Sequence, residues 1–157
     1  MSSRILFVCL GNICRSPTAE GVFRHRARQA GLTDLQIDSA GTAGWHVGKA
    51  PDPRSVAAAQ RRGYDLSALR ARQVLVTDFD HFDLVLAMDR QNLAELKSLA
   101  PRGTKSSLEL FLDYAGRAAF REVPDPYYGG DVGFEQVLDL VEQASDGLIA
   151  RLRGERL

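Results

Sequence analysis

A continuous apolar run near the N-terminus, Ile5–Leu10, restricts the folds open to this chain more than any other feature. Its residues favour strands, and the run lacks the alternation of apolar and polar positions that a half-exposed strand shows. We therefore predict a strand buried on both faces within a parallel sheet. The short loop Gly11–Arg15 follows, and Pro17 then stands at the predicted first position of a helix.

The rest of the chain alternates predicted strands and helices. Short apolar runs predict strands at 35–40 and 84–87, and the run Leu108–Leu112 fits either a strand or a helix. Three helices are predicted, one from about Pro17 to before Gly31, one from Asp52-Pro53 to before Gly63 and one from Asp89 to before Pro101. A long amphipathic helix is predicted from Phe134 to Leu152. This order predicts a single α/β domain over residues 1–157, with right-handed crossovers and a small parallel sheet covered by helices on both faces.

Composition places the chain among globular proteins and argues against two classes of partner. Apolar residues make up 45% and charged residues 25% of its 157 residues, and 20 Lys and Arg balance 20 Asp and Glu. A protein that binds nucleic acid through its overall field is strongly basic, so we expect no nucleic-acid partner. The longest apolar run has six residues, far fewer than the roughly 20 that span a bilayer, so we expect no membrane partner.

The chain has two cysteines, Cys9 and Cys14. Two sulfurs at this spacing form neither a disulfide framework nor a zinc site, so we expect free thiols in a reducing, cytoplasmic compartment. The three histidines, His25, His46 and His81, show no metal-ligand spacing. We therefore expect no metal and no cofactor.

The loop after the first strand has the residues of an anion site. Ligands of open parallel sheets bind beyond the carboxyl ends of the strands, and the free N–H groups of a helix N-terminus attract anions. The amides of Leu10, Gly11, Asn12, Ile13 and Cys14 can surround one phosphate-sized oxyanion as a nest. Glycine and asparagine tolerate the left-handed backbone that such a nest requires. No Gly-Lys-Ser/Thr pattern follows, so a nucleotide is not the expected ligand.

Cys9 and Arg15 add chemistry to this nest. Cys9 ends the strand beneath the anion, where a positive field favours the thiolate, which is the nucleophilic form. Arg15 can hold two phosphate oxygens in its planar fork, and Ser16 can donate its hydroxyl to the sulfur. Together these groups predict in-line phosphoryl transfer to sulfur. The alternative is a buried cysteine that only fills space, but its place between a buried strand and a Pro-marked helix favours catalysis.

Several motifs along the chain point to one known family. Val8-Cys9-Leu10-Gly11-Asn12-Ile13-Cys14-Arg15-Ser16-Pro17 is an uninterrupted signature, and Asp38–Thr42, Ala71–Gln73, Phe82–Asp83, Ala87–Asp89 and Asp125-Pro126-Tyr127-Tyr128 follow it. This set resembles the low molecular weight protein tyrosine phosphatases over nearly the whole chain. The resemblance implies a three-layer sandwich with about four parallel strands and a phosphate-binding loop after the first strand.

By this resemblance, Asp125 is the general acid that protonates the leaving phenolate and then the base that activates water against a phosphocysteine. A bound phosphate dianion would favour its protonated carboxyl, and the prolines on both sides stiffen its loop. The alternative is an exposed turn aspartate. Trp45, Tyr127 and Tyr128 are expected to wall the pocket and to stack on the phenyl ring of the substrate. The alternative for Trp45 is a partly exposed packing residue.

The resemblance also implies supporting roles for Asp89 and Cys14. Asp89 is expected to form a hydrogen bond with Asn12 and so to fix the loop, to cap the following helix, or both. Cys14 resembles the second loop cysteine of the family, which can form a reversible disulfide with Cys9 under oxidation. The alternative for Cys14 is a small packing residue.

The expected function is the metal-independent hydrolysis of protein phosphotyrosine by a monomer or weak dimer whose partners are tyrosine-phosphorylated proteins. In a bacterial host, the resemblance implies an autophosphorylating tyrosine kinase as one such partner. Three alternatives remain. Phosphoarginine phosphatases carry Thr where this chain has Ile13, whose bulkier apolar side chain favours an aryl over a guanidino leaving group. Thiol-dependent arsenate reductases need cysteines beyond position 14, and this sequence has none there, which argues against that activity. A binding module without catalysis would lack Cys9, Arg15 or Asp125.

Overall fold

A computed structural model describes residues 3–116, 121–127 and 131–156. Its strands are β1 (Ser3–Cys9), β2 (Leu35–Gly41), β3 (Leu84–Ala87) and β4 (Ser107–Leu110), which pair in parallel in the order β2-β1-β3-β4. Its helices are α1 (Arg15–Gln29), α2 (Pro53–Arg61), α3 (Asp78–His81), α4 (Arg90–Leu99) and α5 (Asp131–Arg156), with a 3-10 helix, η1 (Phe111–Ala115), after β4. None of the helices within these ranges is long and apolar enough to cross a bilayer.

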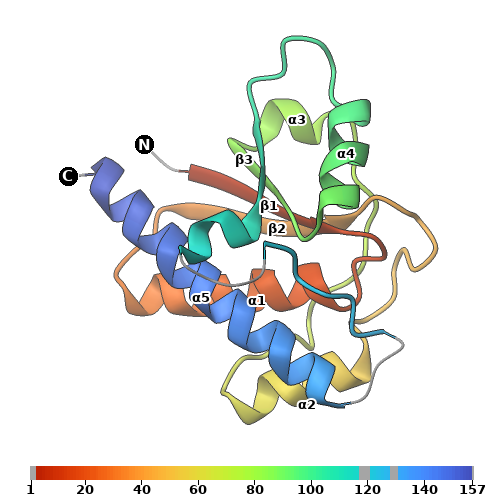
Figure 1. Ribbon diagram of the computed structural model, residues 1–157, viewed down its shortest axis with the longest axis vertical. Helices are drawn as coiled ribbons and strands as arrows, with labels where there is room; N and C mark the ends of the chain where they lie inside the picture. Colours follow the sequence, from red (N-terminus) through yellow and green to blue (C-terminus); the bar gives the residue numbers. More distant parts are fainter. Residues whose placement is uncertain (1–2, 117–120, 128–130, 157) are drawn as a thin grey trace.

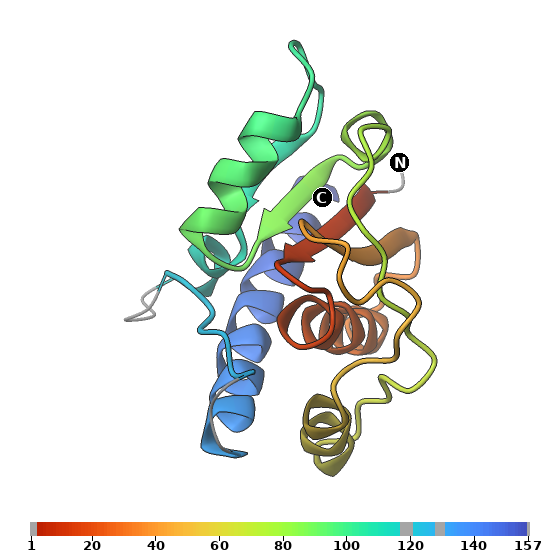
Figure 2. The ribbon, with the colours of Figure 1, turned by 90° about the vertical axis from the view of Figure 1, so that its right-hand side faces the viewer.

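Helices cover both faces of the sheet, so the chain forms the predicted three-layer α/β sandwich (Figures 1 and 2). The two sides of β1 show why. Ile5 and Phe7 point into the apolar cluster formed with α1 and α5, whereas Leu6 and Val8 point into the cluster formed with α3 and α4. All four side chains are fully buried, which confirms the two-sided burial predicted from the continuous apolar run.

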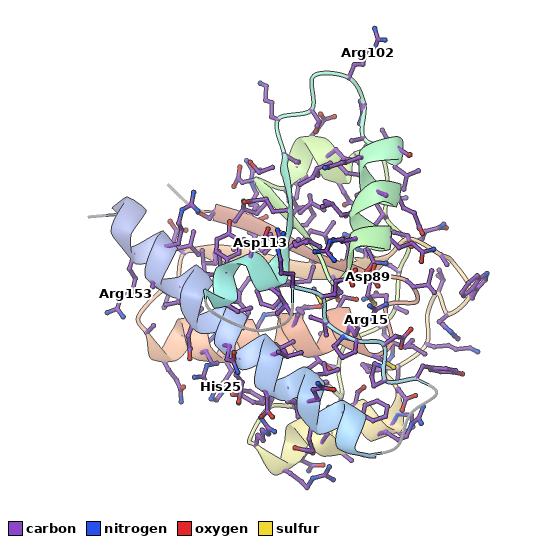
Figure 3. The ribbon with its side chains drawn as sticks, in the orientation of Figure 1. Arg15, His25, Asp89, Arg102, Asp113 and Arg153 are labelled. Atoms are coloured by element: carbon purple, nitrogen blue, oxygen red, sulfur yellow. The ribbon has the colours of Figure 1, made fainter. Side chains whose placement is uncertain are left out.

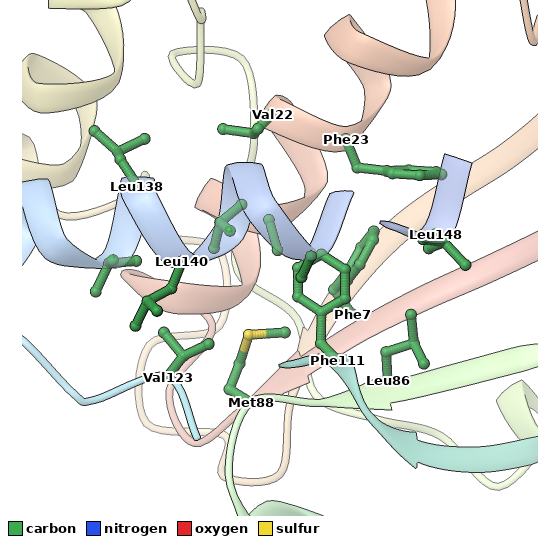
Figure 4. Close-up of a cluster of buried hydrophobic side chains, with 14 of the residues drawn as sticks. Phe7, Val22, Phe23, Leu86, Met88, Phe111, Val123, Leu138, Leu140 and Leu148 are labelled. Atoms are coloured by element: carbon green, nitrogen blue, oxygen red, sulfur yellow. The ribbon is translucent and has the colours of Figure 1, made fainter. Parts of the chain in front are cut away.

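The larger apolar cluster holds β1 against α1 and α5. The Phe7 ring lies edge-on to Phe23 of α1 and to Phe111 of η1, with ring centroids 5.7 Å and 4.9 Å apart. Met88 and Val123 are fully buried in the same cluster, together with side chains of α5 (Figure 4). This packing ties the segment 121–127 to the carboxyl end of β3.

Strand β1 has a neighbouring strand on each of its two edges, and the chain reaches these two neighbours one after the other. Helix α1 leads to β2 on one side of β1, whereas β3 pairs with the opposite side. The direction of the strand order therefore reverses at the carboxyl end of β1, which is where open α/β sheets bind their ligands. The loop between β1 and α1 occupies this position.

Most predicted elements are confirmed, and the differences lie in short segments. Strand β1 ends at Cys9, as predicted, although the apolar run continues to Leu10, and helix α1 begins at Arg15 rather than at Pro17. The run 108–112 contains both predicted alternatives, because β4 ends at Leu110 and η1 begins at Phe111. Helix α3 could not be predicted, because a four-residue helix is too short to show a helical period.

Candidate active site

Asn12 holds the loop between β1 and α1 in shape. Its φ of 57° lies in the left-handed region, which asparagine tolerates better than most residues. Its side-chain Nδ2 donates to Ser16 Oγ at 2.8 Å and to Ser39 Oγ at 3.0 Å, and its Oδ1 accepts from the Arg72 N–H at 2.9 Å. These bonds fix the left-handed residue and, with it, the curve of the loop.

Cys9 lies at the base of this loop with two polar groups at its sulfur. The Asn12 N–H donates to Sγ at 3.2 Å, and Ser16 Oγ lies 3.0 Å from Sγ. Asn12 donates to Ser16 Oγ, so the Ser16 hydroxyl can use its own proton as a donor, and Sγ at 3.0 Å is nearer to it than the Ala40 carbonyl at 3.5 Å. Donors directed at the sulfur stabilise a thiolate.

Arg15 begins α1 and is buried beside the loop. Its Nη1 donates to Asp89 Oδ2 at 2.6 Å and to the Val123 carbonyl at 3.0 Å, and its Nη2 lies 3.7 Å from Asp125 Oδ2. Figure 3 shows Arg15 and Asp89 next to each other. Burial disfavours the charge, but Cys9, Asp89 and Asp125 together hold the pKa of Arg15 above its ordinary value. The site therefore contains a fixed positive charge.

Asp89 supports Arg15 and not Asn12. The expected hydrogen bond between Asp89 and Asn12 is wrong, because the two protons of the Asn12 amide go to Ser16 and Ser39. Asp89 Oδ2 instead accepts from Arg15, and its Oδ1 accepts from the Asn92 N–H at 2.7 Å, which caps α4. The capping prediction is confirmed.

A buried polar chain behind the loop was not predicted from the sequence. Ser39 Oγ donates to Glu20 Oε1 at 2.7 Å, and Arg24 donates to Glu20 Oε2 at 2.8 Å. Burial raises the pKa of Glu20, while the bonds from Ser39 and Arg24 oppose this rise. This series of hydrogen bonds continues from Ser39 to Asn12, from Asn12 to Ser16 and from Ser16 to the Cys9 sulfur. The spacing of Glu20 and Arg24 on α1 indicates an ion pair, but it does not reveal the link to the loop.

A cavity of about 250 Å³ opens at the loop and collects most of the predicted site residues. Its lining residues are Cys9, Leu10, Gly11, Ile13, Cys14, Arg15, Trp45, His46, Asp125 and Tyr127. Trp45 is 70% exposed and Tyr127 is 37% exposed, so both rings stand at the rim. Asn12, Ser16 and Asp89 are not in the lining and support it from behind.

Two residues differ from the set predicted to line the pocket. Tyr128, predicted as a second wall of the pocket, lies outside the described residues. His46 lines the cavity although the sequence indicated no role for it, and its place directly after Trp45 was the available signal. In the described part of the chain, no group of three or more His, Cys, Asp or Glu side chains is arranged to hold a metal ion.

Asp125 stands at the mouth of the cavity and faces Arg15. Its Oδ1 accepts from the Tyr127 N–H at 3.0 Å, and its Oδ2 faces the Arg15 guanidinium. The Val123 N–H donates to the Met88 carbonyl at 2.7 Å and docks the segment on the end of β3. Asp125 is thus exposed, as one alternative expected, and its bond from the Tyr127 N–H is the local contact typical of a turn aspartate, but it also lines the cavity.

Cys14 differs from Cys9 in its surroundings, although both are free thiols. Burial, reinforced by the Asp52 carboxylate, raises the pKa of Cys14 to about 12. A raised pKa favours the neutral thiol at every pH below it. At pH 8 only about one Cys14 side chain in 10⁴ is therefore a thiolate.

We expect iodoacetamide at pH 8 to alkylate Cys9 and to leave Cys14 unmodified in the folded protein, because the thiolate is the reacting form. Peptide mapping by mass spectrometry at a series of times measures both rates. Inorganic phosphate should slow the reaction of Cys9, and unfolding in urea should make both residues reactive. Equal alkylation of the two cysteines in the folded protein would contradict this prediction.

Known proteins share this sequence pattern and this fold. A sequence profile described as low molecular weight phosphotyrosine protein phosphatase matches residues 4–157. The chain is 48% identical over 157 residues to a low molecular weight protein-tyrosine-phosphatase of Streptomyces coelicolor, which covers 98% of this chain and 95% of that protein. The structure of the present chain is similar to the crystal structure of a protein tyrosine phosphatase from Entamoeba histolytica, with 40% identity, a TM-score of 0.93 and coverage of 99% of each chain. It is also similar to the crystal structure of a Drosophila arginine phosphatase, with 31% identity, a TM-score of 0.90 and coverage of 95% of this chain and 97% of that chain.

Proposed function

Because the chain belongs to the low molecular weight phosphotyrosine protein phosphatase family and is therefore a hydrolase, we propose that it dephosphorylates protein phosphotyrosine through a phosphocysteine intermediate. One observation carries the proposal. Cys9 and Arg15, at the two ends of the β1–α1 loop, line the same cavity as Asp125, which comes from a distant part of the chain. These are the residue types that a nucleophile, a phosphoryl clamp and a general acid require.

The first step transfers the phosphoryl group to sulfur. The Cys9 thiolate attacks phosphorus in line with the leaving oxygen, so that a sulfur–phosphorus bond forms while the phosphorus–oxygen bond to the phenyl ring breaks. Asp125 gives its proton to the departing phenolate, whose conjugate acid has a pKa of about 10 and leaves poorly without one. Tyrosine is released.

The second step hydrolyses the phosphocysteine. Asp125, now a carboxylate, takes a proton from a water molecule whose oxygen attacks phosphorus, and the sulfur–phosphorus bond breaks to release inorganic phosphate. The hydroxyl of Ser16, 3.0 Å from Sγ, is placed to stabilise the returning thiolate. The same hydrogen bond therefore supports Cys9 as nucleophile and as leaving group.

Arg15 and the loop amides supply the positive charge for both steps. A planar guanidinium matches two phosphoryl oxygens, and its contact with Asp89 fixes the plane in which it presents its remaining donors. Charge held in place before the reaction stabilises the transition state without reorganisation. We therefore propose that catalysis needs no metal ion.

The walls of the cavity favour an aryl substrate. Trp45 and Tyr127 offer aromatic faces at the rim, and Ile13 offers an apolar side chain within the lining. A flat phenyl ring can stack there, whereas the guanidino group of phosphoarginine would lose hydrogen bonds to water. Phosphoarginine is the alternative to exclude, since one structural neighbour is an arginine phosphatase.

We expect the purified protein to hydrolyse a phosphotyrosine peptide with a kcat/KM at least about tenfold higher than that for a phosphoarginine peptide, the scale of discrimination that one apolar pocket provides. Phosphate release from the two peptides of matched sequence measures this ratio. EDTA should leave the rate unchanged, and vanadate, which imitates the transition state, should inhibit. A higher kcat/KM for phosphoarginine would overturn the substrate assignment.

The proposed partners are tyrosine-phosphorylated proteins. Two free thiols are typical of proteins in a reducing compartment, so we propose that the enzyme acts in the cytoplasm.

A further inference from the structure

Arg54, in the first turn of α2, contacts the segment that carries Asp125. Its Nη2 donates to the Tyr127 carbonyl at 2.7 Å. The guanidinium also lies over two aromatic rings, 4.7 Å from the ring centroid of Phe134 on α5 and 5.7 Å from that of Tyr127. One side chain therefore joins α2, the segment 121–127 and α5.

Arg54 is also linked, through Asp52, to the β1–α1 loop (residues 10–14), which we call the phosphate loop. Arg54 Nε and Nη2 donate to the two carboxylate oxygens of Asp52 at 3.1 Å and 2.9 Å, and these bonds lower the pKa of Asp52. Asp52 is buried, and its N–H donates to the Ile13 carbonyl at 2.8 Å. Arg54 is thus anchored to the loop that surrounds the substrate phosphate.

The segment around Asp125 is held at both ends. Upstream, Val123 is fully buried, with its N–H bonded to Met88 and its carbonyl bonded to Arg15. Downstream, Arg54 holds the carbonyl of Tyr127. Asp125 lies between these points, with a proline on each side that restricts the backbone. Since the Asp125 side chain is 42% exposed, its position depends on these two ends more than on its own packing.

We infer that Arg54 is a positioning residue for general acid catalysis, which it supports by holding the Asp125 segment against the phosphate loop. The inference rests on the proposed function, in which Asp125 protonates the leaving group. Without Arg54, the segment loses the hydrogen bond that ties its Tyr127 carbonyl to α2, and misplacement by about 1 Å can cost 10²-fold in rate. Lysine cannot replace Arg54 fully, because an ammonium group lacks the planar fork that reaches Asp52 and Tyr127 together.

The test compares two substrates that differ in their need for a proton. Phenyl phosphate has a poor leaving group, whereas 2,4-dinitrophenyl phosphate releases a phenolate that needs no protonation. For Arg54→Ala we expect kcat/KM to fall about tenfold with phenyl phosphate and less than about twofold with the activated ester. Arg54→Lys should show the same pattern with a loss of about threefold or more, and it serves as the second variant if Arg54→Ala does not fold.

A matched control and a double variant separate positioning from a general structural role. Helix α2 lies beside α5 (Figure 1). Arg61 lies on α2 like Arg54, is also exposed and pairs with Glu135 of α5 at 2.7 Å, so Arg61→Ala should change both rates less than about twofold. In an Asp125→Ala background, Arg54→Ala should cause no further loss with phenyl phosphate, because the acid through which it acts is absent.

Each of the following outcomes would overturn the inference. Equal losses with both substrates, or a further loss in the double variant, would mean that Arg54 has a structural role only. If the loss of kcat/KM depends on the leaving group in Asp125→Ala but not in Arg54→Ala, the inference about Arg54 fails and the proposed function stands. If Asp125→Ala itself shows no dependence on the leaving group, the acid assignment fails and the inference about Arg54 fails with it.

Discussion

Cys9→Ser is expected to lower the kcat for an aryl phosphate by at least about 10⁴-fold while the affinity for inorganic phosphate changes less than about threefold. A serine hydroxyl ionises far less readily than a thiol and is a much weaker nucleophile in this setting. The substitution replaces one atom, so the contacts of this side chain with the Asn12 N–H and with Ser16 can persist. The nest of amides and Arg15 should therefore still bind the anion.

Turnover of 4-nitrophenyl phosphate and calorimetric titration with inorganic phosphate measure the two quantities. Cys14→Ser is the matched control, since Cys14 lines the same cavity and is held neutral by burial. Its kcat should stay within about tenfold of the original value, because a neutral thiol is not the attacking group. Residual activity above one per cent in Cys9→Ser would argue against sulfur as the nucleophile.

Asp125→Ala is expected to lower kcat/KM for phenyl phosphate by about 10²- to 10³-fold, the range that a general acid contributes. With 2,4-dinitrophenyl phosphate the loss should be less than about tenfold, because that phenolate leaves without a proton. The slope of log(kcat/KM) against leaving-group pKa across a series of aryl phosphates measures the effect, and it should be steeper for Asp125→Ala than for the original enzyme. We use kcat/KM because it reports the formation of the phosphocysteine and not its hydrolysis.

Glu122→Ala provides the control for Asp125. Glu122 lies on the same segment, carries the same charge and has a similar side-chain exposure, 43% against 42%, but it pairs with Arg90 and not with Arg15. Its removal should change both rates less than about twofold, as expected of an exposed ion pair. A uniform loss across all leaving groups in Asp125→Ala would point to a damaged cavity rather than to a missing acid.

Local patterns were enough to predict the elements that present the nucleophile. The run Ile5–Leu10 can bury both faces only in the middle of a sandwich, and Pro17 together with the loop before it marks where α1 begins. Neighbours in the chain determine a strand, a tight loop and a helix start, so these features are readable in order along the sequence. The motif resemblance added Asp125 and the aromatic rim, which spacing alone could not assign.

The partners of the side chains around the sulfur depended on the packing of distant segments. The expected bond from Asp89 to Asn12 was wrong because Ser39, brought alongside by the β1–β2 pairing, takes one amide proton and Ser16 takes the other. Asp89 was then available to Arg15. The contact of Arg54 with Tyr127 has the same origin, since it exists only when α2 and the Asp125 segment meet beside the loop. A hydrogen bond needs its two atoms within about 3 Å, and for residues far apart in the chain only the folded arrangement of the layers sets that distance.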